Sequence, residues 1–194
     1  FEEMPPPTFD GLPMDLYLSP YPILPVLQSR GCYWGKCKFC DHGEGYTAGY
    51  RAKNIGQIIE DIRHLRDKYQ VAHFHFPDES YPAALFKKLT RRLIEADLQI
   101  AWSTHLRFEE SLLDDRVWAD AERSGCKFLH MGFESGSERV LKLMGKATTR
   151  EVIQQSLEAS SGHGVWNHVM GFIESIILKL FSFSDLSSKY WVFP

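Results

Sequence analysis

Segments with a helical spacing of apolar residues alternate with short apolar runs along most of this chain, and this alternation constrains the fold more than any other feature. In residues 55–69 isoleucine and leucine recur every three or four positions, which predicts an amphipathic helix. Further helices are predicted around Leu85–Leu93, around Leu112–Ala121 and, in two pieces about residues 147–149, over 137–161. The runs between them predict five strands, over residues 23–28, 71–76, 99–104, 127–133 and 165–172.

Strands that alternate with helices in this way lie parallel, with the helices as crossovers, so the predicted fold class is α/β. Such a pattern gives either an open doubly wound sheet or a barrel. A complete (β/α)8 barrel needs about 200 residues or more, and about five β/α units are visible here. We therefore predict a partial TIM-like (β/α) barrel that is truncated at its C-terminus. This core would span residues 23–172, after an extended proline-rich leader or linker at 1–22 and before an atypical tail at 173–194.

The charge balance argues against a polyanionic partner. The net charge is −3 and no run of like charges occurs, whereas nucleic-acid-binding proteins usually carry a basic patch. The apolar stretch at 173–183 contains Glu174 and Lys179, so it is too short and too charged to span a membrane. No basic, apolar export signal is visible at the start. The sequence therefore predicts neither a nucleic-acid partner nor a membrane partner.

Three of the four cysteines, Cys32, Cys37 and Cys40, lie within nine residues, and Cys126 stands apart. In a chain without an export signal, such a cluster indicates metal ligands rather than disulfides. Three thiolates can hold three irons of a [4Fe-4S] cluster and leave the fourth iron open to a small molecule. The alternative is a zinc site in which His42 is the fourth ligand. Cys126 is interpreted as a buried apolar residue.

Polar side chains on two predicted strands indicate a cavity. Ser103, His105 and Arg107 share one strand face, and His130 and Glu134 share another. Parallel strands that are buried on both faces are normally apolar throughout, and ligands bind at their carboxyl ends. On an earlier strand His73 and His75 also share a face. Because no carboxylate or cysteine stands at a fixed spacing from them, they are interpreted as hydrogen-bonded interior histidines rather than as a second metal site.

The segment Ser29–His42 resembles the cluster loop of radical S-adenosylmethionine (SAM) enzymes, although four residues separate its first two cysteines where the family commonly has three. Phe76–Glu79 and Ser103–Arg107 are similar to the family's segments on the second and third strands. Gly132–Ser137 is similar to the fourth-strand segment of the subgroup that often carries an N-terminal cobalamin-binding domain, and Phe9–Pro13 resembles the linker after such a domain. The resemblance implies a [4Fe-4S] cluster and SAM as cofactors, with cobalamin in a domain outside this stretch.

The resemblance also implies which residues contact the cofactors. Beside the three cysteine ligands, the candidates are Phe39, Asp78, Glu79, Ser103, Arg107, Glu134 and Ser135.

Four of these candidates have specific implied roles. Asp78 or Glu79 would accept from the SAM ammonium group, or else would cap a helix that begins near Pro82. Arg107 would hold the SAM carboxylate, or else form a surface ion pair. Glu134 would accept from the ribose hydroxyls, or else lie favourably at the start of a helix.

By this resemblance the chain would be an enzyme that cleaves SAM reductively to a 5′-deoxyadenosyl radical, which abstracts hydrogen from an unknown small-molecule or peptide substrate. An external electron donor is implied, and oxygen-sensitive cluster chemistry together with the lack of a targeting signal predicts a cytoplasmic location. Two alternatives remain open: a zinc-binding structural module, and a catalytically incomplete fragment that still binds a cluster.

Overall fold

The computed structural model describes residues 4–41 and 48–170. His42 and the predicted tail at 173–194 lie outside the described residues.

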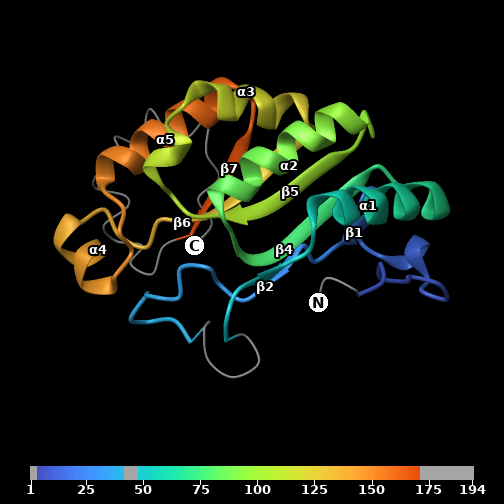
Figure 1. Ribbon diagram of the computed structural model, residues 1–194, viewed down its shortest axis with the longest axis horizontal. Helices are drawn as coiled ribbons and strands as arrows, with labels where there is room; N and C mark the ends of the chain where they lie inside the picture. Colours follow the sequence, from blue (N-terminus) through green and yellow to red (C-terminus); the bar gives the residue numbers. More distant parts are fainter. Residues whose placement is uncertain (1–3, 42–47, 171–194) are drawn as a thin grey trace.

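A parallel sheet of five strands, in the order β1-β4-β5-β6-β7, forms the centre of the molecule (Figure 1). Its strands are β1 (Ile23–Pro25), β4 (His73–Tyr81), β5 (Ala101–Leu106), β6 (Cys126–Gly132) and β7 (Trp166–Met170). The helices are α1 (Ile55–Tyr69), α2 (Ala83–Ala96), α3 (Asp115–Arg123), α4 (Glu138–Met144) and α5 (Arg150–Gly162), with short 3-10 turns η1 (Met14–Leu16) and η3 (Glu110–Leu112). A small antiparallel pair joins β2 (Ser29–Arg30) to β3 (Arg51–Ala52).

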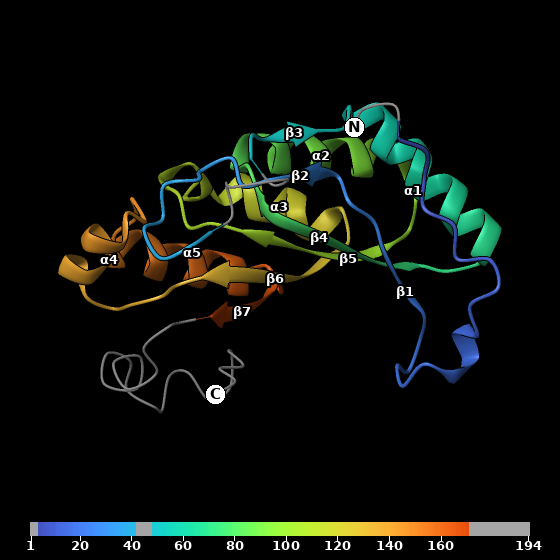
Figure 2. The same ribbon diagram turned by 90° about the horizontal axis from the view of Figure 1, so that it is seen from below.

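The strands of the main sheet lie side by side in the order in which they occur in the chain, and this order decides between the two predicted architectures. A doubly wound sheet would reverse its strand order and carry helices on both faces. Here α1, α2, α3 and α5 all lie along one face of a curved sheet (Figures 1 and 2). The predicted partial (β/α) barrel is confirmed, and its inner face is the one that these helices leave uncovered.

Alternation along the strands separates a helix-covered face from this inner face. On β5, Trp102, Thr104 and Leu106 are buried, while Ser103 and His105 are only partly buried. The buried set joins the apolar stripes of the helices in one core, in which Phe74, Phe76 and Leu129 are almost completely inaccessible. The partly buried set stays on the inner face and is polar, as the sequence pattern predicted.

The predicted helix at 55–69 matches α1 residue for residue. The Asn54 side chain accepts a hydrogen bond from the Gly56 backbone N–H at 2.8 Å, which satisfies one of the free donors at the start of the helix. Residues 137–161 form two helices, as predicted, because Gly145 and Ala147 both take positive φ angles, +74° and +49°, between α4 and α5.

Strand β4 differs from its prediction because it runs to Tyr81 instead of ending at Phe76. Pro77 has no N–H to donate, and the pairing with β5 is irregular between Phe76 and Tyr81, so the strand passes a proline without an unpaired donor. Asp78 and Glu79 therefore lie within the strand. The alternative in which they cap the next helix is wrong: α2 begins at Ala83 after Pro82, without a side-chain cap.

The first predicted strand is shorter than expected, and the third is displaced by two residues, to 101–106. The displacement follows from the turn after α2, where Asp97 and Gln99 both take positive φ and lengthen the connection. In the leader, Phe9 packs edge-on against Tyr69 of α1, at 5.6 Å between ring centroids, so this segment contacts the core.

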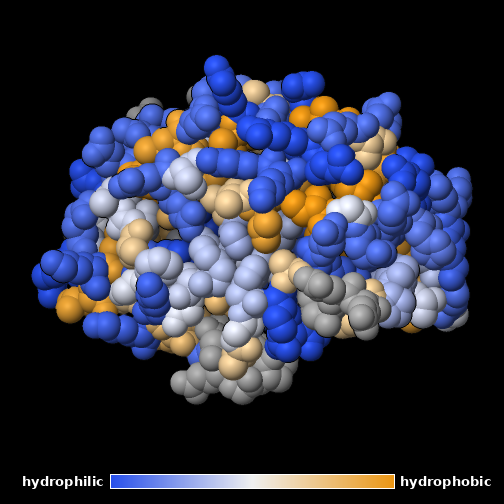
Figure 3. Space-filling view, viewed as in Figure 1, coloured by the Kyte–Doolittle hydropathy of each residue, from blue (hydrophilic) through white to orange (hydrophobic). Residues whose placement is uncertain are grey.

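Within the described part of the chain, every helix is too short or too polar to cross a bilayer. On the face seen in Figure 3, hydrophilic side chains predominate, and hydrophobic atoms show only in separate patches between them.

Candidate functional site

The cysteine loop follows β2 and lies near α4, beyond the carboxyl ends of the strands (Figure 2). All four cysteines are free thiols: Cys32 and Cys37 are partly buried, Cys40 is exposed and Cys126 is buried in the core. Burial raises the pKa of the Cys126 thiol far above its ordinary value, which keeps this side chain protonated and inert. The loop therefore presents three accessible thiols, and the fourth cysteine is a core residue, as interpreted from the sequence.

Two carboxylates of β4 hold the start of this loop. Asp78 is fully buried, and its Oδ1 accepts from the Gln28 N–H at 3.2 Å, the Ser29 hydroxyl at 2.6 Å and the Ser29 N–H. Oε2 of Glu79 accepts from the Gly31 N–H at 3.1 Å. Burial raises the pKa of Asp78 to about 7, although the hydrogen bonds from residues 28 and 29 oppose that rise. Both side chains thus position the backbone that leads into Cys32.

The end of α4 holds the middle of the loop. The Trp34 indole N–H donates to the Gly145 carbonyl at 2.8 Å, and the Lys38 N–H donates to the Met144 carbonyl at 3.0 Å. Gly145 has φ of +74°, and a Cβ atom there would lie 2.5 Å from the Lys36 carbonyl oxygen. Glycine is required at this position both for its backbone conformation and for the close approach of the loop.

Arg107 follows β5 and lies beneath the loop. Its guanidinium stacks on the Trp34 ring, 4.1 Å from the centroid, and donates to the Lys146 carbonyl. Its Nη1 lies 3.6 Å from Oε1 of Glu109, which also accepts from the Tyr33 hydroxyl. The side chain is 8% exposed, so the surface ion pair considered for it is wrong. Burial lowers the pKa of Arg107, but a guanidinium stays protonated in proteins, so a cation is held here.

Glu134 and Lys146 form a second, mostly buried ion pair, with 3.1 Å between Oε1 and Nζ. Glu134 takes a positive φ of +61° just after β6, which turns its side chain back over Gly132. A Cβ at Gly132 would lie 2.6 Å from the Glu134 carboxylate and 2.9 Å from the Lys146 ammonium, so the pair occupies the space of the missing side chain. Glu134 lies four residues before Glu138, where α4 begins, and its carboxylate pairs with Lys146. The helix-start alternative for Glu134 is therefore wrong.

Arg107 and Lys146 are close enough to Cys37 to influence its thiol electrostatically. Burial raises the pKa of the Cys37 thiol, while the positive charges of Lys146 and Arg107 oppose the rise. Nε of Arg107 is buried and has no hydrogen-bond partner among the described residues. A cationic environment with a spare donor suits an anionic iron–sulfur cluster or a carboxylate ligand.

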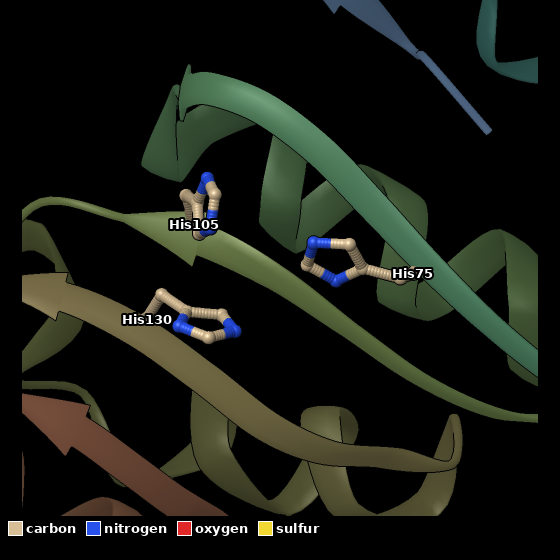
Figure 4. Close-up of side chains that lie close together, drawn as sticks. All are labelled: His75, His105 and His130. Atoms are coloured by element: carbon tan, nitrogen blue, oxygen red, sulfur yellow. The ribbon is translucent and has the colours of Figure 1, made fainter. Parts of the chain in front are cut away.

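Histidines line the inner face of the sheet. His75, His105 and His130 come from β4, β5 and β6, and one nitrogen of each ring lies within 4.8 Å of one nitrogen of the others (Figure 4). Strand register explains the grouping: His105 pairs with His130, and His75 pairs with Ser103, two residues before His105. Burial lowers the pKa of all three rings, that of His130 to about 4, where the neighbouring histidines contribute as well.

An open groove of about 1090 Å³ lies beside the cysteine loop. Tyr33, Trp34 and Lys36 of the loop line one part of it, and Arg139 and Lys142 of α4 line another, whereas the cysteines themselves do not. Its lining is aromatic and charged, with Glu109, Glu110 and Glu138 beside the cations.

The family model described as the radical SAM superfamily matches residues 26–178. The chain belongs to the radical SAM superfamily.

Curated relatives of this radical SAM chain include several methyltransferases. It is 29% identical over 182 residues to an uncharacterised methyltransferase of Pyrococcus horikoshii, covering 88% of this chain and 38% of that protein. It is 28% identical over 173 residues to the bacteriochlorophyllide d C-12(1)-methyltransferase of Chlorobaculum tepidum, covering 86% and 35%. A tRNA-2-methylthio-N(6)-dimethylallyladenosine synthase of Phocaeicola vulgatus is 30% identical over 135 residues, 63% of this chain and 28% of that protein. The chain thus spans between 28% and 38% of the length of these relatives.

Two solved structures share the fold of this radical SAM chain. The radical SAM methyltransferase TsrM from Kitasatospora setae, with cobalamin and a [4Fe-4S] cluster bound, gives a TM-score of 0.67 at 13% identity over 78% of this chain and 31% of that one. The cobalamin-dependent radical SAM enzyme OxsB, with aqua-cobalamin bound, gives 0.63 at 23% identity over 76% and 23%. These likenesses show a shared fold.

The structure brings most of the predicted radical SAM residues to one end of the sheet, but several already have partners in the protein. Ser103 Oγ lies 2.8 Å from Nδ1 of His75, and Ser135 is fully buried with its Oγ accepting from the Ser137 N–H. Phe39 is 39% exposed on the loop. The sequence analysis did not predict the group of His75, His105 and His130. His105 and His130 lie on other strands, and no fixed spacing along the chain connects them to His75.

Proposed function

We propose that this chain is the cluster- and SAM-binding core of a radical SAM enzyme, with Cys32, Cys37 and Cys40 as the cluster ligands. The observation that carries the proposal is the loop itself. Three free thiols are held from two sides, by carboxylates of β4 and by the end of α4, beside the cations Arg107 and Lys146. In the zinc alternative a fourth protein ligand would be needed, and the suggested one, His42, lies outside the described residues.

The protein groups near the loop fit both cofactors. When bound and reduced, the cluster supplies the electron that cleaves SAM. The free Nε–H of Arg107 could orient a carboxylate, and the Glu134 carboxylate could accept from hydroxyls if it exchanged Lys146 as its partner. Glu79 lies on the inner-face side of β4 and remains a candidate for the SAM ammonium, whereas Asp78 Oδ1 already accepts three hydrogen bonds from the loop. We propose residues 23–172 as this core, with 1–22 as a linker.

Methyl transfer is the reaction class that we propose for the whole protein. Two of the relatives described above are named as methyltransferases, and the TsrM and OxsB structures described above hold cobalamin. A cobalamin-binding domain would then lie outside the residues described. The substrate class is not specified by these relatives, since their names range from bacteriochlorophyllide to tRNA.

Anaerobic reconstitution with iron and sulfide, followed by reduction in the presence of SAM, tests the proposal. We expect about four iron and four sulfide per chain and the formation of 5′-deoxyadenosine. Cys37→Ala should abolish cluster uptake, while Cys126→Ala, a thiol removed from the core, should retain it. Zinc bound without sulfide by the wild type and lost in Cys37→Ala would establish the structural-module alternative. A cluster without SAM cleavage would indicate a catalytically incomplete core.

A further inference from the structure

The three inner-face histidines form an arrangement that neither the cluster nor SAM requires. They belong to three neighbouring strands, so the backbone that carries them is held by the parallel sheet on both sides. Ring centroids are 4.7 Å apart for His105 and His130 and 5.5 Å apart for His75 and either of the others. Figure 4 shows the three rings converging on one space above the sheet.

Each of these rings already uses its Nδ1 atom. Nδ1 of His105 lies 2.8 Å from the Asp78 carbonyl oxygen, and because a carbonyl only accepts, this nitrogen carries the proton and Nε2 keeps its lone pair. Nδ1 of His75 contacts the Ser103 hydroxyl at 2.8 Å, and Nδ1 of His130 contacts Nδ1 of His168 at 3.1 Å. Histidines that bind metals characteristically use the second ring nitrogen in such a hydrogen bond, which fixes the tautomer and the ring orientation.

We propose that His75, His105 and His130 bind a divalent transition-metal ion of the zinc class, at a site separate from the cysteine loop. Three imidazoles without a thiolate suit zinc and the neighbouring first-row ions, and three protein ligands leave a position for water or for an oxygen or nitrogen donor of a substrate. Two nitrogens bound to one tetrahedral zinc at 2.0–2.1 Å lie about 3.3 Å apart. Small rotations of the side chains bring nitrogens that lie within 4.8 Å of one another to that separation.

The surroundings support an ion at this place. The rings are half-buried, and Ser103, Asp78 O and His168 act as outer partners from three different strands. Glu79 is close enough to His105 to influence it electrostatically, and it adds a negative charge to a group of neutral ligands. The proposal does not depend on the proposed radical SAM activity, because the three ligands are neither cysteines nor candidate SAM contacts.

The test is zinc binding by a protein whose cysteine loop cannot bind metal. In a Cys32→Ser, Cys37→Ser, Cys40→Ser variant, freed of any histidine tag, we expect one Zn²⁺ per chain in a titration against a chromophoric chelator. Adding His105→Ala should lower the affinity by about 100-fold or more, and Ser103→Ala, which removes an outer partner, by about 10-fold. His73→Ala is the matched control: it lies two residues before His75 on the same strand, stacks on Tyr21 and should leave zinc affinity unchanged.

Circular dichroism shows whether each variant is folded. If the triple serine variant fails to fold, zinc per chain is measured by elemental analysis on the cluster-loaded wild type and on its His105→Ala variant, after zinc is added and unbound ions are removed. We expect one zinc per chain only with the histidines intact. Absence of zinc binding in the folded triple variant, or equal affinity with and without His105, would overturn the proposal, whatever the outcome for the cluster.

Discussion

At the scale of single residues, the Asp78 side chain contacts the backbone before the cysteine loop, whereas the sequence predicted a contact with a cofactor or a helix cap. The resemblance assigns either Asp78 or Glu79 to the SAM ammonium group, and the fold puts Oδ1 of Asp78 behind the cysteine loop, where it accepts from Ser29 and Gln28. Its Oδ2 is buried without a partner among the described residues, which agrees with a carboxyl whose pKa burial raises to about 7. A buried acceptor of this kind stabilises the loop whether or not it is ionised.

Substitution at this position separates the two roles. Asp78→Asn retains an acceptor oxygen of the same shape, so we expect near-normal stability and cluster content. Asp78→Ala leaves the buried N–H groups of residues 28 and 29 unpaired and should lower the free energy of unfolding by about 2–4 kcal/mol. Denaturant unfolding and iron analysis check both expectations. Weaker SAM binding by a folded, cluster-loaded Asp78→Asn protein would instead support the ammonium contact.

At the scale of elements, the end of α4 supports the cysteine loop through hydrogen bonds to its backbone carbonyls. It is short, and its end supplies the Met144 and Gly145 carbonyls that accept from Lys38 and Trp34. The contact relies on the left-handed conformation and the missing side chain of Gly145.

Gly145→Ala therefore displaces the loop. A Cβ would collide with the Lys36 carbonyl, and the positive φ adds about 1 kcal/mol of backbone strain. We expect a substantially lower iron content after reconstitution, with the far-UV circular dichroism of the fold retained. Gly162→Ala is the control, since Gly162 has no neighbour within 4 Å of the added methyl group. Equal iron content in the two variants would show that the loop does not need this contact.

Helices α3 and α5 are linked by a titratable group. His163 lies 2.9 Å from the Asp115 carboxylate and 3.5 Å from that of Glu122. The hydrogen bond to Asp115 is the largest cause that raises the pKa of His163, and the charge of Asp115 and the contact with Glu122 add to it.

The folded-state pKa is raised, so the stabilisation is fully present below about 6.5, the ordinary value, and is lost as pH rises through the folded value. The carboxylates are exposed, and solvent screening limits the effect to about 0.5 kcal/mol. His163→Gln should therefore lower the midpoint of urea unfolding at pH 5.5 and change it little at pH 8.5. A loss of the same size at both pH values would contradict the ion pair.

For the whole molecule, the cysteine loop joins elements that are far apart in the sequence. It contacts β4 through Glu79, the segment after β5 through Arg107, and the end of α4 through Gly145. A ligand that orders the loop should therefore stabilise the domain as a unit.

Cluster loading is expected to raise the melting temperature of the chain by about 5–10 °C, because a ligand present at 100 times its Kd adds about 2.7 kcal/mol to the folded state. Differential scanning fluorimetry of reconstituted and untreated protein under anaerobic conditions measures the shift. Cys37→Ala, treated in the same way, should show none. A shift in that variant would place the stabilising metal elsewhere in the molecule.

The sequence by itself determined the fold class, the order of strands and helices, the split between α4 and α5, and the assignment of Cys32, Cys37 and Cys40 as one group, because each depends on neighbours along the chain. Helical and strand periodicities are local, and three thiols within nine residues need no fold to bring them together. The family resemblance rests on the same local segments.

Tertiary structure alone decided which side chains meet. Parallel register brings His75, His105 and His130 together from positions 25 or more residues apart, and the irregular pairing after Phe76 places Asp78 behind the loop. The left-handed backbone at Glu134 turns its carboxylate onto Lys146, twelve residues away. Such contacts depend on strand register and on single φ angles, which no residue pattern specifies. The sequence therefore named candidate residues, and only the fold showed which of them lie in contact.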